Sequence, residues 1–248
     1  MQLIELRDYI EIELKSSRFK DYCPNGLQIE GKPEVERLAT AVTASQAVLE
    51  AASDWGADAL LVHHGYFWRG ESAPITGIKK RRIAHLLRHD ISLLAYHLPL
   101  DAHPVWGNNA QLGKLLGFVE HGRFGEQDIA CHGGLLQPRT LGELVSDLTR
   151  ELKRTPQVIG DLNTKVARIA WCSGAAQSYF EQAIALGVDA FLTGEISEQN
   201  VHCAEESGVA FIAAGHHATE RLGVRALGQH LSAQFSLEHR FFDQQNPI

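Results

Sequence analysis

The sequence has no two cysteines close enough together to form a C-x-x-C motif. Its four cysteines, Cys23, Cys131, Cys172 and Cys203, lie far apart, which suits neither a disulfide framework nor a zinc knuckle. Such a pattern indicates a protein of the reducing cytoplasm. Cys172 stands inside an apolar run, and we expect its side chain in the core.

Long hydrophobic runs are also missing. The apolar stretches, such as residues 57–62 with Asp58 among them, are far too short to span a bilayer, so no membrane segment is expected. Residues 1–15 alternate leucine and isoleucine with four acidic residues. This spacing predicts an amphipathic surface helix and does not resemble a secretory signal.

An excess of positive charge is absent as well. Lysine and arginine number 23 and aspartate and glutamate 30, so the net charge is 23 − 30 = −7. An acidic chain binds phosphate backbones poorly, so a nucleic-acid partner is not expected. The basic run Lys79–Arg82 departs from this trend. It is either the solvated start of a helix that ends near His89 or a patch that receives a phosphorylated ligand.

What the chain does contain is a repeat. Residues 38–62 hold an apolar run, a helical stretch and a second apolar run, and residues 168–193 hold the same series. The shift is constant, because 177 − 46 = 131 for two glutamines and 187 − 56 = 131 for two glycines. Asp58 and Asp189 fall in register. A repeat of this length predicts a duplicated structural unit.

The correspondence continues with a second offset. His97 and Asp101 follow one apolar run, and His216 and Glu220 follow another; 216 − 97 and 220 − 101 both equal 119. Each half therefore contains strand, helix, strand, helix and strand. The strands are continuous apolar runs, as expected for parallel sheets that helices cover on both faces.

The fold class that follows is α/β. We expect two duplicated lobes, residues 1–121 and 122–248, with mainly parallel sheets and a ligand site in the cleft between them. The second lobe includes a less regular linker at 122–165. Within it, Thr140 and Glu143 form a capping box, which predicts a helix that runs through Leu152.

Chemically active residues gather where four of the predicted strands end. The strand-end residues are His63, His64, His97, Asp101, Glu195, His216, His217 and Glu220. Residues four apart on a helical turn face the same way, so H-x-x-x-D and H-x-x-x-E suit metal chelation. Imidazoles and carboxylates bind zinc, iron or manganese. The set exceeds the needs of one tetrahedral ion, so we expect two adjacent divalent ions.

Each of these residues also has an ordinary structural explanation. A single strand-end histidine is usually a hydrogen-bonded structural residue, and an aspartate in this position can cap a helix. His97 is either a ligand or the partner that orients one, and Glu195 is either a general base or a structural carboxylate. His217 is expected to face away or to bind substrate. The remaining histidines have no carboxylate at useful spacing and are not expected to be ligands: His85, His89, His103, His121, His132, His202, His230 and His239.

Several longer motifs resemble the Nif-three-like family, in particular its short, YbgI-like branch. They are Asp21–Gln28, Val62–Trp68, His97–Asp101, Gly194–Gln199 and Ala214–Glu220. The similarity covers essentially the whole chain. The short linker leaves no room for the extra domain that longer relatives insert between their lobes.

The resemblance implies a dinuclear metal centre whose ligands map onto His63, His64, Asp101, His216 and Glu220. It also implies a ring-shaped homohexamer, and it places the intact Asp21–Gln28 loop near the site. Family members are often labelled GTP cyclohydrolase 1 type 2 homologues, which suggests hydrolysis of a purine nucleotide.

Two functional hypotheses follow. The first is a metal-dependent hydrolase in which Asp101 or Glu220 bridges the ions and Glu195 or His97 shuttles a proton; phosphoester hydrolysis is an equally reasonable use of such a site. A nucleotide would need a phosphate receiver. No G-x-x-x-x-G-K-[ST] loop exists, so only Lys79–Arg82 or Arg221 could serve. The second hypothesis is a non-catalytic metal-binding regulator or scaffold.

Overall fold

The chain folds into two compact units. The computed structural model describes residues 1–248. The first unit contains residues 1–107 and 223–245, and the second contains residues 108–222 and 246–248. Along the chain, the second unit begins before the predicted division at residue 122. Helix α9 (His216–Phe235) crosses from one unit into the other, which is why the chain returns to the first unit near its end.

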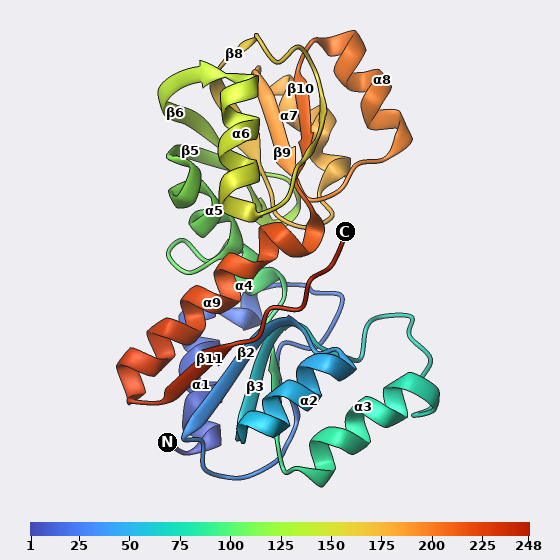
Figure 1. The fold of residues 1–248 in the computed structure, drawn as a ribbon, viewed down its shortest axis with the longest axis vertical. Coiled ribbons are helices and arrows are strands. Elements are labelled where there is room, and N and C mark those ends of the chain that lie inside the picture. The colour runs from blue at the N-terminus through green and yellow to red at the C-terminus, as the bar shows by residue number, and fades with distance from the viewer. The chain divides into compact units, whose positions relative to one another are not determined.

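The first unit has a five-stranded sheet in the order β1-β4-β3-β2-β11. Its strands β2, β3 and β11 are labelled in Figure 1. The strands are β1 (Gly26–Ile29), β2 (Arg37–Thr43), β3 (Ala59–His64), β4 (Ser92–Ala95) and β11 (Glu238–Phe241). The strands β11, β2, β3 and β4 are mutually parallel, and β1 pairs antiparallel with β4 at one edge. The apolar runs of the sequence correctly predicted the three central strands.

Helices cover both faces of this sheet. The first unit contains α1 (Leu3–Leu14), η1 (Ser16–Arg18), α2 (Gln46–Trp55), α3 (Gly77–Arg88), α4 (Leu98–Ala102) and most of α9. Leucines of α1 and α9 pack with Leu61 and Leu94 in one cluster. Residues of α2 and α3 pack with the neighbouring Leu60 and Leu93 in a second cluster. Because side chains alternate along a strand, an apolar run buries its residues on both faces.

The second unit has a six-stranded sheet in the order β5-β6-β8-β9-β10-β7. Its strands are β5 (Phe118–Phe124), β6 (Ala130–Thr140), β7 (Gln157–Ile159), β8 (Lys165–Trp171), β9 (Ala190–Thr193) and β10 (Ala210–Ala213). The strands β8, β9 and β10 are parallel, whereas β5, β6 and β7 pair antiparallel. Its helices are α5 (Asn108–Leu116), η2 (Glu126–Asp128), α6 (Leu141–Leu152), η3 (Gln177–Tyr179), α7 (Phe180–Ala185) and α8 (Glu198–Ser207).

The segment that we expected to be a linker, 122–165, is mostly regular structure. It contributes β6, α6 and β7 to the second unit. The predicted capping box is present: the Thr140 hydroxyl accepts from the Glu143 backbone N–H, and the Glu143 carboxylate accepts from the Thr140 backbone N–H. Paired antiparallel strands satisfy the backbone groups of this segment, although its sequence lacks a regular apolar pattern.

The internal repeat has a structural counterpart in two equivalent aspartates. In the first unit, Asp58 Oδ2 accepts from the backbone N–H groups of Glu36 and Arg37, each at 3.0 Å. In the second, Asp189 Oδ2 accepts from the backbone N–H groups of Ala167 and Arg168, at 2.9 and 2.8 Å. Each carboxylate therefore holds the backbone just before the first parallel pairing of its unit, β2 with β3 and β8 with β9.

No helix of the structure combines the length and the apolar composition that crossing a lipid bilayer requires. Cys23, Cys131 and Cys172 are buried, Cys203 is partly exposed, and all four are free thiols.

The two aspartates should make stability depend on acid. Burial alone would raise the pKa of Asp58 and of Asp189, but the backbone hydrogen bonds prevail and lower both values. A lowered folded-state pKa stabilises the protein above the unfolded value of about 4, and this stabilisation is lost as the pH falls through the folded value. We expect Asp58→Asn or Asp189→Asn to lower the free energy of unfolding by about 1–3 kcal/mol at pH 7.

Urea unfolding at pH 7 and pH 3 measures this effect. The two variants should lose less stability than the native protein between these pH values. Asp54→Asn removes the same charge from an exposed position of α2 and is the matched control. Equal losses of unfolding free energy in the native protein and in all three variants would contradict this role of the aspartates.

Candidate metal centre

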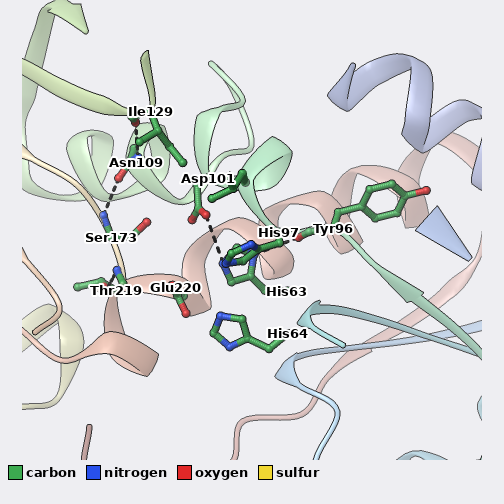
Figure 2. Close-up of polar contacts among 12 residues, drawn as sticks. His63, His64, Tyr96, His97, Asp101, Asn109, Ile129, Ser173, Thr219 and Glu220 are labelled. Atoms are coloured by element: carbon green, nitrogen blue, oxygen red, sulfur yellow. Dashed lines mark hydrogen bonds and ion pairs between the residues drawn. The ribbon is translucent and has the colours of Figure 1, made fainter. Parts of the chain in front are cut away.

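Two neighbouring parallel strands of the first unit end in potential metal ligands. His63 and His64 are the last residues of β3. After β4, His97 directly precedes the short helix α4, and Asp101 lies within that helix. Because β3 and β4 pair in register, their carboxyl ends lie at the same edge of the sheet. Figure 2 shows the three histidine rings gathered beside Asp101.

His63 is completely buried, and its ring orientation is fixed. Its Nδ1 lies 3.0 Å from the backbone oxygen of Tyr96. A carbonyl oxygen can only accept, so Nδ1 carries the proton and Nε2 is the nitrogen that presents a lone pair. His63 Nε2 lies 3.4 Å from Asp101 Oδ2, and the Asp101 side chain is also buried.

His64 and His97 are oriented in a similar way. His64 Nδ1 lies 3.2 Å from the Thr43 hydroxyl at the end of β2. His97 Nδ1 donates to the Asp21 carboxylate at 2.7 Å. The ligand atoms of His63, His64 and His97 all lie within 4.8 Å of one another.

The loop Asp21–Gln28 holds the His97 end of this set, as its place in the sequence motif had suggested. Asp21 Oδ2 accepts from the Leu98 backbone N–H at 3.0 Å and from the Asn25 amide at 2.9 Å. Burial alone would raise the pKa of Asp21, but the hydrogen bonds from His97 and Asn25 lower it. Asp21 is therefore a carboxylate that fixes the His97 ring.

The second unit carries a smaller donor set at the start of α9. His216 and Glu220 are four residues apart on this helix, and His216 Nε2 lies 3.1 Å from Glu220 Oε1. His216 Nδ1 lies 2.6 Å from Glu195 Oε1, in the segment after β9. Burial alone would lower the pKa of His216, but the hydrogen bonds with Glu220 and Glu195 raise it to about 9.

Two glycines of the second unit leave room for these side chains. Gly174 has φ +68°, and a Cβ added there would lie 2.3 Å from Glu220 Oε1. A Cβ on Gly194 would lie 2.6 Å from the His216 Cα. A side chain at residue 174 would therefore displace the Glu220 carboxylate, and one at residue 194 would displace the backbone of His216.

Polar residues that the sequence analysis did not single out frame this set (Figure 2). Asn109 accepts from the Ser173 backbone N–H at 2.8 Å and donates to the Ile129 backbone oxygen at 2.8 Å. The Thr219 hydroxyl accepts from the Gly174 backbone N–H at 3.0 Å. No motif or spacing pointed to Asn109, because its partners, which also include the Cys172 sulfur, are distant from it in sequence.

The donor chemistry of each unit suits a divalent ion. Donor atoms around one tetrahedral zinc ion, each about 2.1 Å from it, lie about 3.4 Å apart. The His63–Asp101 distance of 3.4 Å and the His216–Glu220 distance of 3.1 Å agree with such a spacing. Metal-binding histidines also usually donate their second ring N–H to a carboxylate or a carbonyl, as His63, His97 and His216 do.

A second group of the first unit, Asp21, Cys23 and His97, also has closely spaced donor atoms. It suits a metal less well. Burial and the nearby Asp21 raise the pKa of the Cys23 thiol to about 12, and a thiol binds metals only as the thiolate. Asp21 is already committed to the His97 ring.

Most of the remaining histidines have structural contacts, as expected. The rings of His85, His230 and His239 hydrogen-bond to hydroxyl groups of Ser53, Tyr9 and Thr40. His202 does have a carboxylate at helical spacing, contrary to the sequence analysis: it lies 3.5 Å from Glu198 in an exposed ion pair within α8. The helical spacing of four residues explains this pair. His217 belongs to none of the groups with metal-compatible spacing.

A comparison with protein families agrees with the motifs: the family described as Duf34/NIF3 (NGG1p interacting factor 3) matches residues 1–247. The chain belongs to the Duf34/NIF3 family. A relative from Neisseria meningitidis serogroup B, named GTP cyclohydrolase 1 type 2 homolog, is 54% identical over 234 residues, which cover 94% of each chain.

Two solved structures of this fold are also similar. One is described as protein ybgI of unknown function; it is 49% identical, has a TM-score of 0.97 and matches all of both chains. The other is TTHA1606 from Thermus thermophilus, which is 35% identical, has a TM-score of 0.92 and also matches all of both chains. The similarities confirm the predicted family and its α/β fold.

The close approach at Gly174 provides a test of the donor set of the second unit. We expect Gly174→Ala to displace the Glu220 carboxylate and to weaken divalent-metal affinity by about tenfold or more, as when a group that holds a ligand is disturbed. Gly208→Ala is the matched control, since Gly208 has φ +72° with no atom within 4 Å of the added Cβ. Both variants should lose about 1–2 kcal/mol through the left-handed backbone.

Metal titration by calorimetry, with thermal unfolding of the metal-free proteins, separates the two effects. If Gly174→Ala and Gly208→Ala bound metal equally well, Glu220 would not be a ligand.

Proposed function

We propose that the protein binds two divalent metal ions and acts as a metal-dependent hydrolase. The proposed ligands are His63, His64, Asp101, His216 and Glu220. The observation that carries the proposal is the orientation of the histidine rings. An acceptor oxygen engages Nδ1 of His63 and of His216, which leaves Nε2 as the coordinating atom of each.

The two ions, when bound, supply the Lewis acidity that makes water a nucleophile near neutral pH. The protein supplies rigidity. His63 and Asp101 are buried, and Glu220 is held four residues from His216 on one helix face. Fixed ligands of this kind lower the reorganisation that the reaction requires.

Glu195 and His97 are the proposed residues for proton transfer and positioning. The Glu195 carboxylate lies against His216 Nδ1, and its side chain is 32% exposed. It can therefore orient the imidazole while one carboxylate oxygen remains accessible to a proton from substrate. His97 has the same relation to Asp21, with the histidine 15% exposed.

The proposed substrate class is a nucleotide or a related phosphoester. Relatives named GTP cyclohydrolase 1 type 2 homolog support this choice. Of the cations suggested as phosphate receivers, Lys79 is engaged with Glu71 and the Ser72 backbone oxygen. Arg221 donates to the Leu152 backbone oxygen. The exposed Lys80 and Arg81 of α3 are better placed for an anion from solvent.

An activity screen tests the proposed reaction. Protein reconstituted separately with manganese, iron and zinc is assayed against nucleoside triphosphates, cyclic nucleotides and simple phosphoesters. We expect turnover of at least one compound with one metal, abolished by chelation. If metal-loaded protein hydrolysed none of them, the non-catalytic metal-binding regulator would replace the hydrolase.

Metal content tests the ligand set independently of activity. We expect His64→Ala and Glu220→Ala to lower the metal bound per chain, measured by elemental analysis after gel filtration, while the circular dichroism spectrum stays native. His202→Ala, a change of the same kind in an exposed histidine, should retain the native content. Unchanged metal in both ligand variants would refute the assignment.

The oligomeric state and the cytoplasmic location also remain predictions. We propose the ring-shaped homohexamer that the resemblance implies, and sedimentation velocity measures it directly. A chain of 27.4 kDa that sedimented as a monomer would contradict this.

A further inference from the structure

Two aromatic side chains of the first unit, Tyr22 and Trp68, lie beside the histidines of the candidate site; we call this pair the aromatic rim. The ring centroid of Trp68 is 5.1 Å from that of His97, and the ring centroid of Tyr22 is 6.3 Å from it. Their ring planes are inclined to the imidazole plane by 86° and 66°, respectively, so neither ring stacks on it. Tyr22 is 48% exposed and Trp68 is partly exposed. Tyrosine and tryptophan with an exposed ring are typical of binding surfaces.

The indole of Trp68 has a fixed orientation. Its Nε1–H donates to the Gly65 backbone oxygen at 3.3 Å, so the polar group of the ring is already engaged. The Trp68 backbone N–H donates to the Glu71 carboxylate at 3.1 Å, and the Glu71 backbone N–H donates to the Trp68 backbone oxygen at 2.9 Å. Because the indole donor is used within the chain, the ring offers a ligand its π face and not a hydrogen bond.

Hydrogen bonds join the two segments that carry the rim. The Arg69 backbone N–H donates to the Tyr22 backbone oxygen at 2.7 Å. The Tyr66 backbone N–H donates to Gln28 Oε1 at 2.7 Å, and Gln28 Nε2 donates to the Tyr66 backbone oxygen at 3.1 Å. The two segments are therefore held together before a ligand arrives, which lowers the cost in conformational entropy of binding to the rim.

Backbone strain is present next to the rim. Phe67, which directly precedes Trp68, has φ +66°. Bulky residues rarely adopt this left-handed conformation, because the side chain crowds the backbone. Strained residues persist only where the surrounding contacts over-determine them, and they cluster at sites that clamp a ligand. The strain at Phe67, between two hydrogen-bonded neighbours, supports a binding role for this segment.

A cation lies next to the rim. The Arg69 guanidinium carbon is 5.6 Å from the ring centroid of Tyr22, and Arg69 is exposed. Arg69 Nη2 donates to the Asp21 backbone oxygen at 2.8 Å. A guanidinium has five N–H donors, so this bond leaves donors for an anion. Arginine binds phosphate through paired hydrogen bonds, and its position here suits a phosphate next to a stacked ring.

We infer that the aromatic rim and Arg69 form a nucleotide-binding subsite, in which the rim stacks the base and Arg69 holds the phosphate. The exposed π surface, its fixed orientation and the adjacent guanidinium support this assignment. Every base has a π face, so stacking on an aromatic ring tolerates any base. The subsite therefore distinguishes a nucleotide from a sugar phosphate without a base. This inference rests on the nucleotide class of the proposed function and does not depend on bound metal or on hydrolysis.

Binding to the metal-free protein tests the role of the rim. Guanosine 5′-monophosphate (GMP) and ribose 5-phosphate are titrated into the full chain with a chelator present, and affinity is measured by ligand-observed NMR. We expect GMP to bind about 5–150-fold more tightly, which is the range that one stacked base contributes. Trp68→Leu should remove most of this difference. Trp68→Phe retains an aromatic face and should keep most of it.

Trp55→Leu is the matched control for Trp68→Leu. It makes the same change at a partly exposed tryptophan of α2, whose ring lies beside Phe242. Its affinity for GMP should equal that of the native protein. Circular dichroism checks that each variant folds. Tyr22→Leu, at the more exposed position of the rim, should also lower GMP affinity, by about fivefold or more, and keeps the test decisive if Trp68→Leu does not fold.

Arg69→Gln tests the phosphate contact. It should weaken the binding of GMP and of ribose 5-phosphate equally, by about tenfold or more, because it removes a charge-assisted hydrogen bond. The binding of guanosine, which has no phosphate, should not change. Arg69→Lys keeps the positive charge and should retain part of the affinity for GMP. Equal GMP affinity in the native protein and in Arg69→Gln would show that Arg69 does not hold the phosphate.

Failure of this inference and failure of the proposed function give different results. If Trp68→Leu, Tyr22→Leu and Trp55→Leu all bound GMP as tightly as the native protein, the rim would not hold the base, even if metal-loaded protein hydrolysed a phosphoester. If the native protein bound GMP no better than ribose 5-phosphate, the subsite would likewise be refuted. If metal-loaded protein hydrolysed nothing while Trp68→Leu still lowered GMP affinity, the hydrolase would fail and the subsite would stand.

Discussion

The hydrogen bond at Nδ1 of each site histidine is the constraint on which the rest of the account depends. A neutral imidazole has one donor and one acceptor nitrogen, and the partner of one decides what the other can do. The Tyr96 carbonyl fixes His63, Asp21 fixes His97 and Glu195 fixes His216. Each ring is therefore set for coordination by the folded chain.

These partners come from different parts of the chain, so the fold must assemble them. The parallel pairing of β3 and β4 brings Tyr96 beside His63, and the Asp21–Gln28 loop reaches His97 through Asp21 and Asn25. The duplicated α/β unit explains why strand ends are used. In a parallel sheet these ends are adjacent, and the polar residues there need not be covered by helices.

The duplication is unequal in its chemistry. With the offset of 131, His63 and His64 correspond to positions 63 + 131 = 194 and 64 + 131 = 195, which are Gly194 and Glu195. The first unit therefore keeps three imidazoles, while the second has one imidazole and a carboxylate that supports it. Gly194 is needed there because its missing side chain lets the His216 backbone approach.

Much of this could be predicted from the sequence. The continuous apolar runs identified the central strands, and the capping box at Thr140 identified the start of α6. The strands β1, β7 and β11 were not predicted because they are short edge strands, which carry little apolar pattern. The unit boundary at residues 107 and 222 was not predicted either, since no change in composition marks it.

Part of the candidate site could also be predicted from the sequence. Strand-end position and the spacing of four residues selected His63, Asp101 and Glu220 among many polar residues. Asn109 gave no signal, because its contacts join segments distant in sequence and follow no spacing rule. Thr219 was included only as part of the motif Ala214–Glu220, without a role of its own. His202 shows the reverse case, in which helical spacing produces an ion pair on an exposed surface.

The central claim is that this chain holds divalent metal at oriented imidazoles. The most direct measurement is anomalous X-ray scattering from crystals soaked in manganese, recorded with a matched metal-free crystal. We predict two anomalous peaks per chain, with Nε2 of His63 coordinated and its Nδ1 still bonded to the Tyr96 carbonyl. An absence of anomalous density at these histidines, in crystals that contain manganese elsewhere, would contradict the account.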